Sequence, residues 1–145
     1  MNISNQIIAW EDKNPVLFVI LRVVLGLILA IRGIYFLTTI EPLYHLIRGS
    51  KLSELNMNMP LAMFICWVHT LGGTFIILGL LTRISVWAQI PIILGAIIFI
   101  NLNQNLPATF PSLLLAIFVL ILLILFAVAG GGKISMDYYA KGHLL

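Results

Sequence analysis

Residues 84–132 read ISVWAQIPIILGAIIFINLNQNLPATFPSLLLAIFVLILLILFAVAGGG, a stretch without a single Asp, Glu, Lys or Arg. A helix needs about 20 apolar residues to cross the hydrocarbon core of a bilayer, so this stretch is long enough for two crossings. The polar residues 101–105, closed by Pro107 and Pro111, divide it. The sequence therefore predicts membrane helices over residues 84–100 and 111–129.

The N-terminal half contains two more apolar stretches, predicted as helices over residues 15–39 and 60–81. Pro15 suits the first turn of a helix, and Thr82 with Arg83 leaves only a tight turn before the third helix. The charged segment 41–58 predicts an exposed loop with an amphipathic turn on the membrane surface.

Composition agrees with this pattern, because 61% of the residues are hydrophobic and only 9% are charged. A soluble domain carries roughly 25% charged residues. The net charge of +3 indicates contact with anionic lipid headgroups rather than with nucleic acid. We predict an all-α, polytopic integral membrane protein, a four-transmembrane-helix bundle forming a single membrane domain over residues 1–145.

The distribution of basic residues predicts the orientation of this bundle. Four crossings put both termini on one side, together with Lys13, Arg83, Lys133 and Lys141. The opposite side has Arg48 and Lys51. Basic loops favour the cytoplasm, so both termini are predicted to be cytoplasmic. The first fourteen residues lack the pattern of a cleaved signal peptide.

Two arginines, Arg22 and Arg32, lie within the first predicted helix, where a central charge costs about 2.5–3.5 kcal/mol. Either side chain could snorkel to the interface. Arg22, however, shares a helical face with Gly26 and Gly33, and small residues mark helix contacts. Arg22 is therefore expected to point into the bundle.

The predicted helices contain no carboxylate that could pair with these arginines, because every acid lies in a loop or tail. The remaining acceptors are backbone carbonyls, Gln89 for Arg22, Glu41 for Arg32, a lipid phosphate or a ligand oxygen. The sequence does not choose among them.

His69 lies near the middle of the second predicted helix and is interpreted first as a hydrogen-bonding group between helices. A proton relay, a quinone hydrogen bond and a metal ligand are the alternatives. Cys66 lies one turn away, but His45 and His143 are predicted on opposite sides of the membrane, and no second histidine or acid accompanies His69 at ligand spacing. No metal site and no cofactor are therefore predicted. Gly72, Gly73 and Gly79 are interpreted as packing positions.

Three segments form a recognisable set: LRVVLGLILAIRGIYFL at 21–37, GGTFIILGLLTR at 72–83 and GGGKISMD at 130–137. Together they resemble the DoxX family of small membrane proteins. The resemblance implies a four-helix bundle in the cytoplasmic (inner) membrane of a prokaryote. It marks these motif positions, without catalytic roles: Arg22, Gly26, Gly33, Gly73, Gly79, Arg83, Lys133, Ser135 and Asp137.

The chain departs from the family pattern at two positions. Many relatives have His-Gly where this chain has Arg32 and Gly33, and a glutamate where His69 stands. Family members are named after a subunit of a thiosulfate:quinone oxidoreductase. The lost glutamate favours a structural role here over redox or proton chemistry.

Three functions follow from these features. The first is a small membrane subunit or accessory factor of a larger redox or envelope complex, with other membrane subunits and lipids as partners and without catalysis of its own. The second is a quinone-interacting component of an oxidoreductase, using Arg22, Arg32 or His69. The third is a small-solute transporter.

Overall fold

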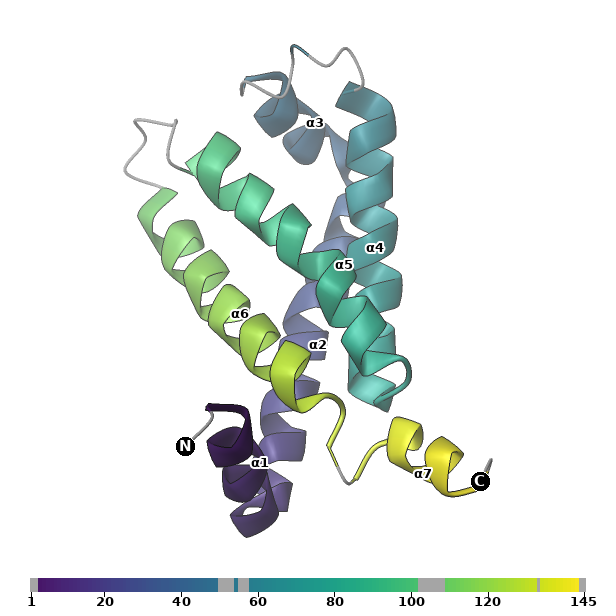
Figure 1. Cartoon of the computed structure of the whole chain (residues 1–145). Helices are drawn as coiled ribbons and strands as arrows, with labels where there is room; N and C mark the ends of the chain where they lie inside the picture. Colours follow the sequence, from purple (N-terminus) through teal and green to yellow (C-terminus); the bar gives the residue numbers. More distant parts are fainter. Residues whose placement is uncertain (1–2, 50–53, 55–57, 102–108, 133, 144–145) are drawn as a thin grey trace.

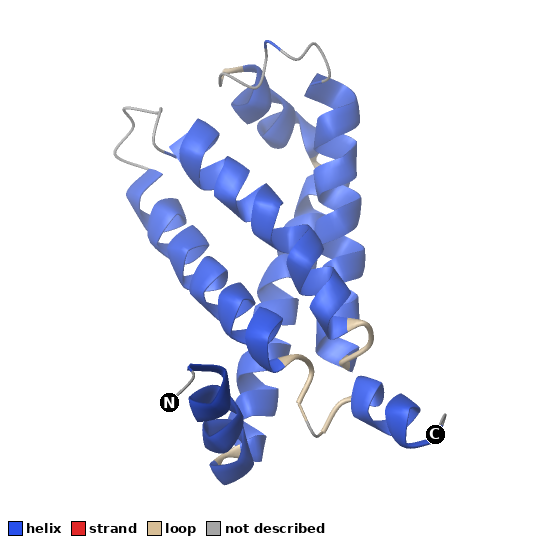
Figure 2. Ribbon diagram, in the orientation of Figure 1, coloured by secondary structure: helices blue, strands red, loops and turns tan. Residues whose placement is uncertain are grey.

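The computed structural model describes residues 3–49, 54, 58–101, 109–132 and 134–143. Its main elements are all helices (Figures 1 and 2): α1 Ile3–Lys13, α2 Pro15–Thr38, α3 Ile40–Arg48, α4 Asn58–Leu78, α5 Thr82–Gly95, the π-helix η2 Ala96–Asn101, α6 Thr109–Ala129 and α7 Met136–His143. The fold is all-α.

Four of the described helices are strongly apolar. Two of them, over Pro15–Thr38 and Met59–Leu78, are long and apolar enough to cross a membrane, and shorter apolar helices cover Thr82–Ile98 and Leu113–Ala129. Many of their large apolar side chains are exposed in the isolated chain. Lipid accommodates such surfaces, whereas water does not.

The closest packing in the bundle is between α2 and α4, which lie against each other through glycine. A Cβ atom added to Gly26 would stand 2.7 Å from the carbonyl oxygen of Gly73, and one added to Gly73 would stand 2.5 Å from the backbone nitrogen of Ala30. Small residues allow this approach of the two backbones.

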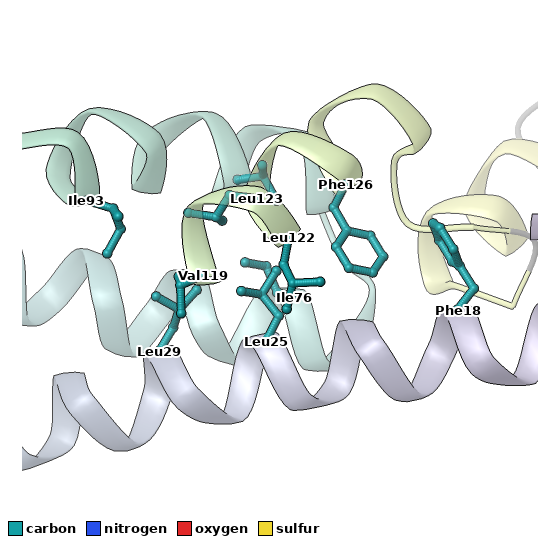
Figure 3. Close-up of a cluster of buried hydrophobic side chains, with 10 residues drawn as sticks. Phe18, Leu25, Leu29, Ile76, Ile93, Val119, Leu122, Leu123 and Phe126 are labelled. Atoms are coloured by element: carbon teal, nitrogen blue, oxygen red, sulfur yellow. The ribbon is translucent and has the colours of Figure 1, made fainter. Parts of the chain in front are cut away.

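The main core joins α2 and α4 to α5 and α6 (Figure 3). Its buried members are Phe18, Leu25, Leu29, Ile76, Val86, Ile93, Val119, Leu122, Leu123 and Phe126. The rings of Phe18 and Phe126 meet edge to face with centroids 4.8 Å apart, a favoured aromatic geometry. This contact ties the start of α2 to the end of α6.

The predicted loop at 41–58 is wrong in its first part, because α3 forms there. Leu43 and Ile47 are buried on one side of α3, in a second core with Ala62 and Cys66, while Glu41 and Arg48 are exposed. The single amphipathic turn that we expected is thus a full helix packed on α4 (Figure 1).

Several predicted boundaries also change. The second membrane helix ends at Leu78 rather than at residue 81, and the third begins at Thr82 rather than at residue 84. Gly79, with φ +69°, lies in the turn between them and favours this early end. The N-terminal segment and the tail form two further helices, α1 and α7, which were not among the four predicted ones.

Candidate functional site

The most polar buried region lies where the tail after α6 meets the turn between α4 and α5. We call it the Arg22 cluster and define it as Arg22, Gly79, Leu81, Thr82, Gly131, Ile134, Ser135 and Asp137. Its members come from α2, from the turn and from the tail, which are far apart in sequence and adjacent in space.

Arg22 is the buried cation of this cluster, with 4% of its surface exposed. Its Nη1 atom donates hydrogen bonds to the carbonyl of Gly131 and, at 3.1 Å, to that of Ile134. The acceptors of Arg22 are therefore backbone carbonyls of the tail. The Nε atom of Arg22 has no partner among the described residues.

Asp137 holds the turn that starts α5. Its carboxylate accepts hydrogen bonds from the backbone N–H of Leu81 at 2.7 Å and of Thr82 at 2.9 Å, and its own N–H donates to the carbonyl of Gly79 at 2.9 Å. The first N–H groups of a helix lack partners within the helix, and a carboxylate also suits the helix dipole. Asp137 thus caps α5 from the tail.

Asp137 both interacts with the charge of Arg22 and stabilises a strained backbone conformation at Leu81. Its carboxylate is close enough to Arg22 for a favourable Coulombic interaction. Leu81 has φ 48°, in the left-handed region that side chains with a Cβ atom disfavour. The hydrogen bond from the Leu81 N–H to Asp137 stabilises this conformation.

Glycines let the cluster close around the guanidinium group. A Cβ atom on Gly79 would stand 2.9 Å from Arg22 Nη1 and 2.8 Å from the Cβ atom of Ser135. Gly131 is similarly confined, because a Cβ atom added there would lie 2.8 Å from Thr82 Oγ1. Ser135 donates from Oγ to the Gly132 carbonyl at 2.6 Å. The chain itself therefore lies close around the Nη1 atom of Arg22.

Arg83 lies at the edge of the same region. Its Nη2 atom donates to the Val128 carbonyl at 3.2 Å, near the end of α6. Gly130, with φ +84°, leaves room for it, because an added Cβ atom would stand 3.1 Å from Arg83 Nε. Lys133, another motif position, lies outside the described residues.

Comparison with known proteins agrees with these motifs: the DoxX family model matches residues 17–102. The chain belongs to the DoxX family. It is accordingly a multi-span membrane protein. Arg22 and the turn at 79–83 lie within the match, whereas the tail that binds them lies beyond it. Neither the curated proteins nor the solved structures give a significant match.

Gln89 of this DoxX protein lies on α5 and is completely buried. In the described part of the chain it is not among the hydrogen-bond acceptors of Arg22. Its Nε2 atom donates to the Val68 carbonyl at 2.8 Å, and Gly72 makes room because an added Cβ atom would stand 2.7 Å from Nε2. Gln89 thus joins α5 to α4. Its Oε1 atom has no partner in the described part of the chain.

A second polar group lies toward the α3 end of α2 and α4. His69 is buried with 6% exposure, and its Nδ1 atom has no partner among the described residues. Arg32 is exposed and near enough for its charge to act on the His69 imidazole. The contact of Gly33 with Thr70 sets these two positions at the same level. Cys66 packs separately, in the α3 core.

Within the described ranges, no three His, Cys, Asp or Glu side chains lie together as a metal site would need. The arrangement instead offers hydrogen-bond donors: Arg22 Nη1, directed at the tail, and the exposed Arg32 guanidinium, which has no hydrogen bond to the described residues.

Sequence reasoning missed two parts of the Arg22 cluster. The sequence indicates Asp137 as a tail acid and a family motif position but gives it no partner, although a carboxylate five residues after a Gly-Gly-Gly run can fold back on a neighbouring helix start. Thr82 was counted as a turn residue, yet it is completely buried. The signal for their contact in the sequence was the resemblance, which marks motif positions in both the turn and the tail.

Proposed function

We propose that this DoxX protein is a small subunit or accessory factor of a larger membrane complex, redox or envelope, with no catalysis of its own. It would reside in the cytoplasmic membrane of a prokaryote with both termini in the cytoplasm. Its role would be to present a rigid helical surface to larger membrane partners.

The observation that supports this proposal is that Arg22 donates its hydrogen bonds to the protein's own tail. A buried arginine in a membrane helix usually marks a functional site. Here its Nη1 atom donates to the carbonyls of Gly131 and Ile134, and Gly79 leaves no room for a Cβ atom beside the guanidinium group. This buried arginine therefore serves to fix the tail on the helices.

Mass analysis of the tagged protein, extracted gently from its native membrane, tests the proposal. We expect defined larger membrane proteins in constant stoichiometry with it. The matched control is the Gly73→Val variant, which should not assemble a bundle and should lose these partners. A lone homo-oligomer from the native membrane would contradict the subunit role.

A quinone-interacting role is the second candidate, favoured by the Nδ1 atom of His69, which has no partner among the described residues and lies near Arg32. A quinone carbonyl would accept a hydrogen bond from either side chain. Titration of the purified protein with a short-chain quinone, followed by tryptophan fluorescence, tests it. Saturable quenching lost in His69→Phe would support this role over the first.

A further inference from the structure

The tail after α6 is held at a defined level along α2. A Cβ atom added to Gly132 would stand 3.0 Å from the ring of Phe18, and the Nη1 atom of Arg22 donates to the Ile134 carbonyl at 3.1 Å. Phe18 and Arg22 are one turn apart, and both lie inside an apolar helix that is long enough to cross a membrane. The tail therefore packs against the first turns of this helix and not beyond its end.

Exposed apolar side chains of α2 lie at the same level as the tail. Leu17 precedes Phe18 directly, Ile20 lies between Phe18 and Arg22, and both are exposed. Val16, also exposed, lies six residues before Arg22, or about 9 Å nearer the start of the helix at about 1.5 Å per residue. Because the chain is a multi-span membrane protein, these side chains of α2 face lipid. Lipid therefore surrounds the protein at the level where the tail is attached.

The tail itself exposes large apolar and aromatic side chains at this level. We call them the tail surface and define it as Ile134, Met136, Tyr138 and Tyr139, which are between 52% and 71% exposed. Asp137 lies among them and is directed at the bundle, because its carboxylate caps α5. In Figure 1, α7 lies below the lower ends of α4 and α5 and runs outward from the bundle.

The tail surface lies next to the exposed apolar surface at the start of α5. Leu81, whose N–H donates to Asp137, is 53% exposed. Ile84 and Trp87 follow on α5, at about one and two turns from Leu81, and are exposed as well. Trp and Tyr side chains are enriched where acyl chains meet headgroups. The exposed Trp87 and the tyrosines of α7 match this zone.

We propose that the tail surface is a lipid-binding surface, which lies in the interfacial zone of the adjacent membrane leaflet. Its apolar side chains contact the upper acyl chains, and the tyrosine rings lie at the level of the headgroups. Arg22 and Asp137 thus hold on the bundle a segment that is also immersed in lipid. This lipid contact is independent of the subunit role proposed above.

Nitroxide labels on the purified protein in liposomes of phosphatidylethanolamine and phosphatidylglycerol test this contact. Single labelling sites are introduced by Ile134→Cys, Met136→Cys and Tyr138→Cys in a Cys66→Ser background, and the variants that elute as monodisperse protein are compared. Collisions of the label with dissolved oxygen report acyl chains, whereas collisions with a water-soluble nickel chelate report water.

Two further labelling sites supply the references. Ile121→Cys lies at an exposed position in the middle of α6 and is the lipid reference. Glu54→Cys lies at an exposed position of the charged segment between α3 and α4 and is the aqueous reference. Both are made in the same Cys66→Ser background.

We expect the ratio of oxygen to nickel collisions in Met136→Cys and Tyr138→Cys to exceed that of Glu54→Cys several-fold and to stay below that of Ile121→Cys. Ile134→Cys should give a ratio between the same two references. Ratios equal to that of Glu54→Cys would place the tail surface in water and overturn the proposal. Few collisions with either probe would mean that protein, such as a second copy of this chain, covers the tail surface, and would overturn it as well.

Discussion

Arg22 on α2 donates a hydrogen bond to the carbonyl of Gly131, 109 residues later in the chain. This contact joins the first membrane helix to the tail that follows the last one. It gives a buried cation backbone acceptors, and Asp137 lies close to the same charge. The end of the bundle is therefore closed by its own C-terminal segment.

Arg22→Leu should destabilise the folded protein by about 3 kcal/mol, because the Gly131 and Ile134 carbonyls lose a charged donor inside the bundle. We expect a lower yield of monodisperse protein after extraction and a lower Tm. Arg32→Leu is the control, since Arg32 is exposed and has no protein acceptor in the described ranges. An unchanged yield of folded Arg22→Leu would show that Arg22 is not satisfied inside the bundle.

Asp137→Ala should reduce stability by about 1–2 kcal/mol, because the N–H groups of Leu81 and Thr82 lose their cap. Asp137→Asn keeps one acceptor oxygen and should lose less, although it removes the attraction to Arg22. Thermal unfolding of the three proteins should therefore rank wild type above Asn and Asn above Ala. A Tm of the Ala variant equal to wild type would contradict the capping role.

The sequence predicted the membrane helices well because apolar length is a local property. Residues 84–132 carry no charge, and the polar run at 101–105 has no place within a membrane helix. The inward direction of Arg22 also followed from helical spacing with Gly26 and Gly33. Each of these features can be read from residues that lie close together in the sequence.

Other features depended on contacts that are distant in sequence. The partners of Arg22 are carbonyls, which every residue possesses, so composition cannot single out Gly131. The capping of α5 by Asp137 crosses 55 residues or more. α3 was mistaken for a loop because it is short and charged, and Leu43 and Ile47 stabilise it only by packing against α4.

Cys66 should resist labelling while α3 remains docked. The thiol is completely buried, with Leu43, Ile47 and Ala62 in the same core. Ile47→Ala opens this core and should increase the labelling rate by a membrane-permeant maleimide several-fold. Met63→Ala, at an exposed position of α4, should not. Rapid labelling of the wild type would show that α3 does not cover Cys66.

Gly73→Ala should destabilise the bundle by about 1–3 kcal/mol, because its Cβ atom would stand 2.5 Å from the backbone nitrogen of Ala30 and 2.8 Å from the Gly26 carbonyl. Backbone atoms cannot move aside as a side chain can, so α2 and α4 must separate. Gly95→Ala is the matched control, since its Cβ atom would meet nothing within 4 Å and alanine favours a helix by roughly 0.5–1 kcal/mol. Thermal unfolding should place Gly73→Ala below wild type and Gly95→Ala at or above it. The reverse order would mean that α2 and α4 do not meet through Gly73.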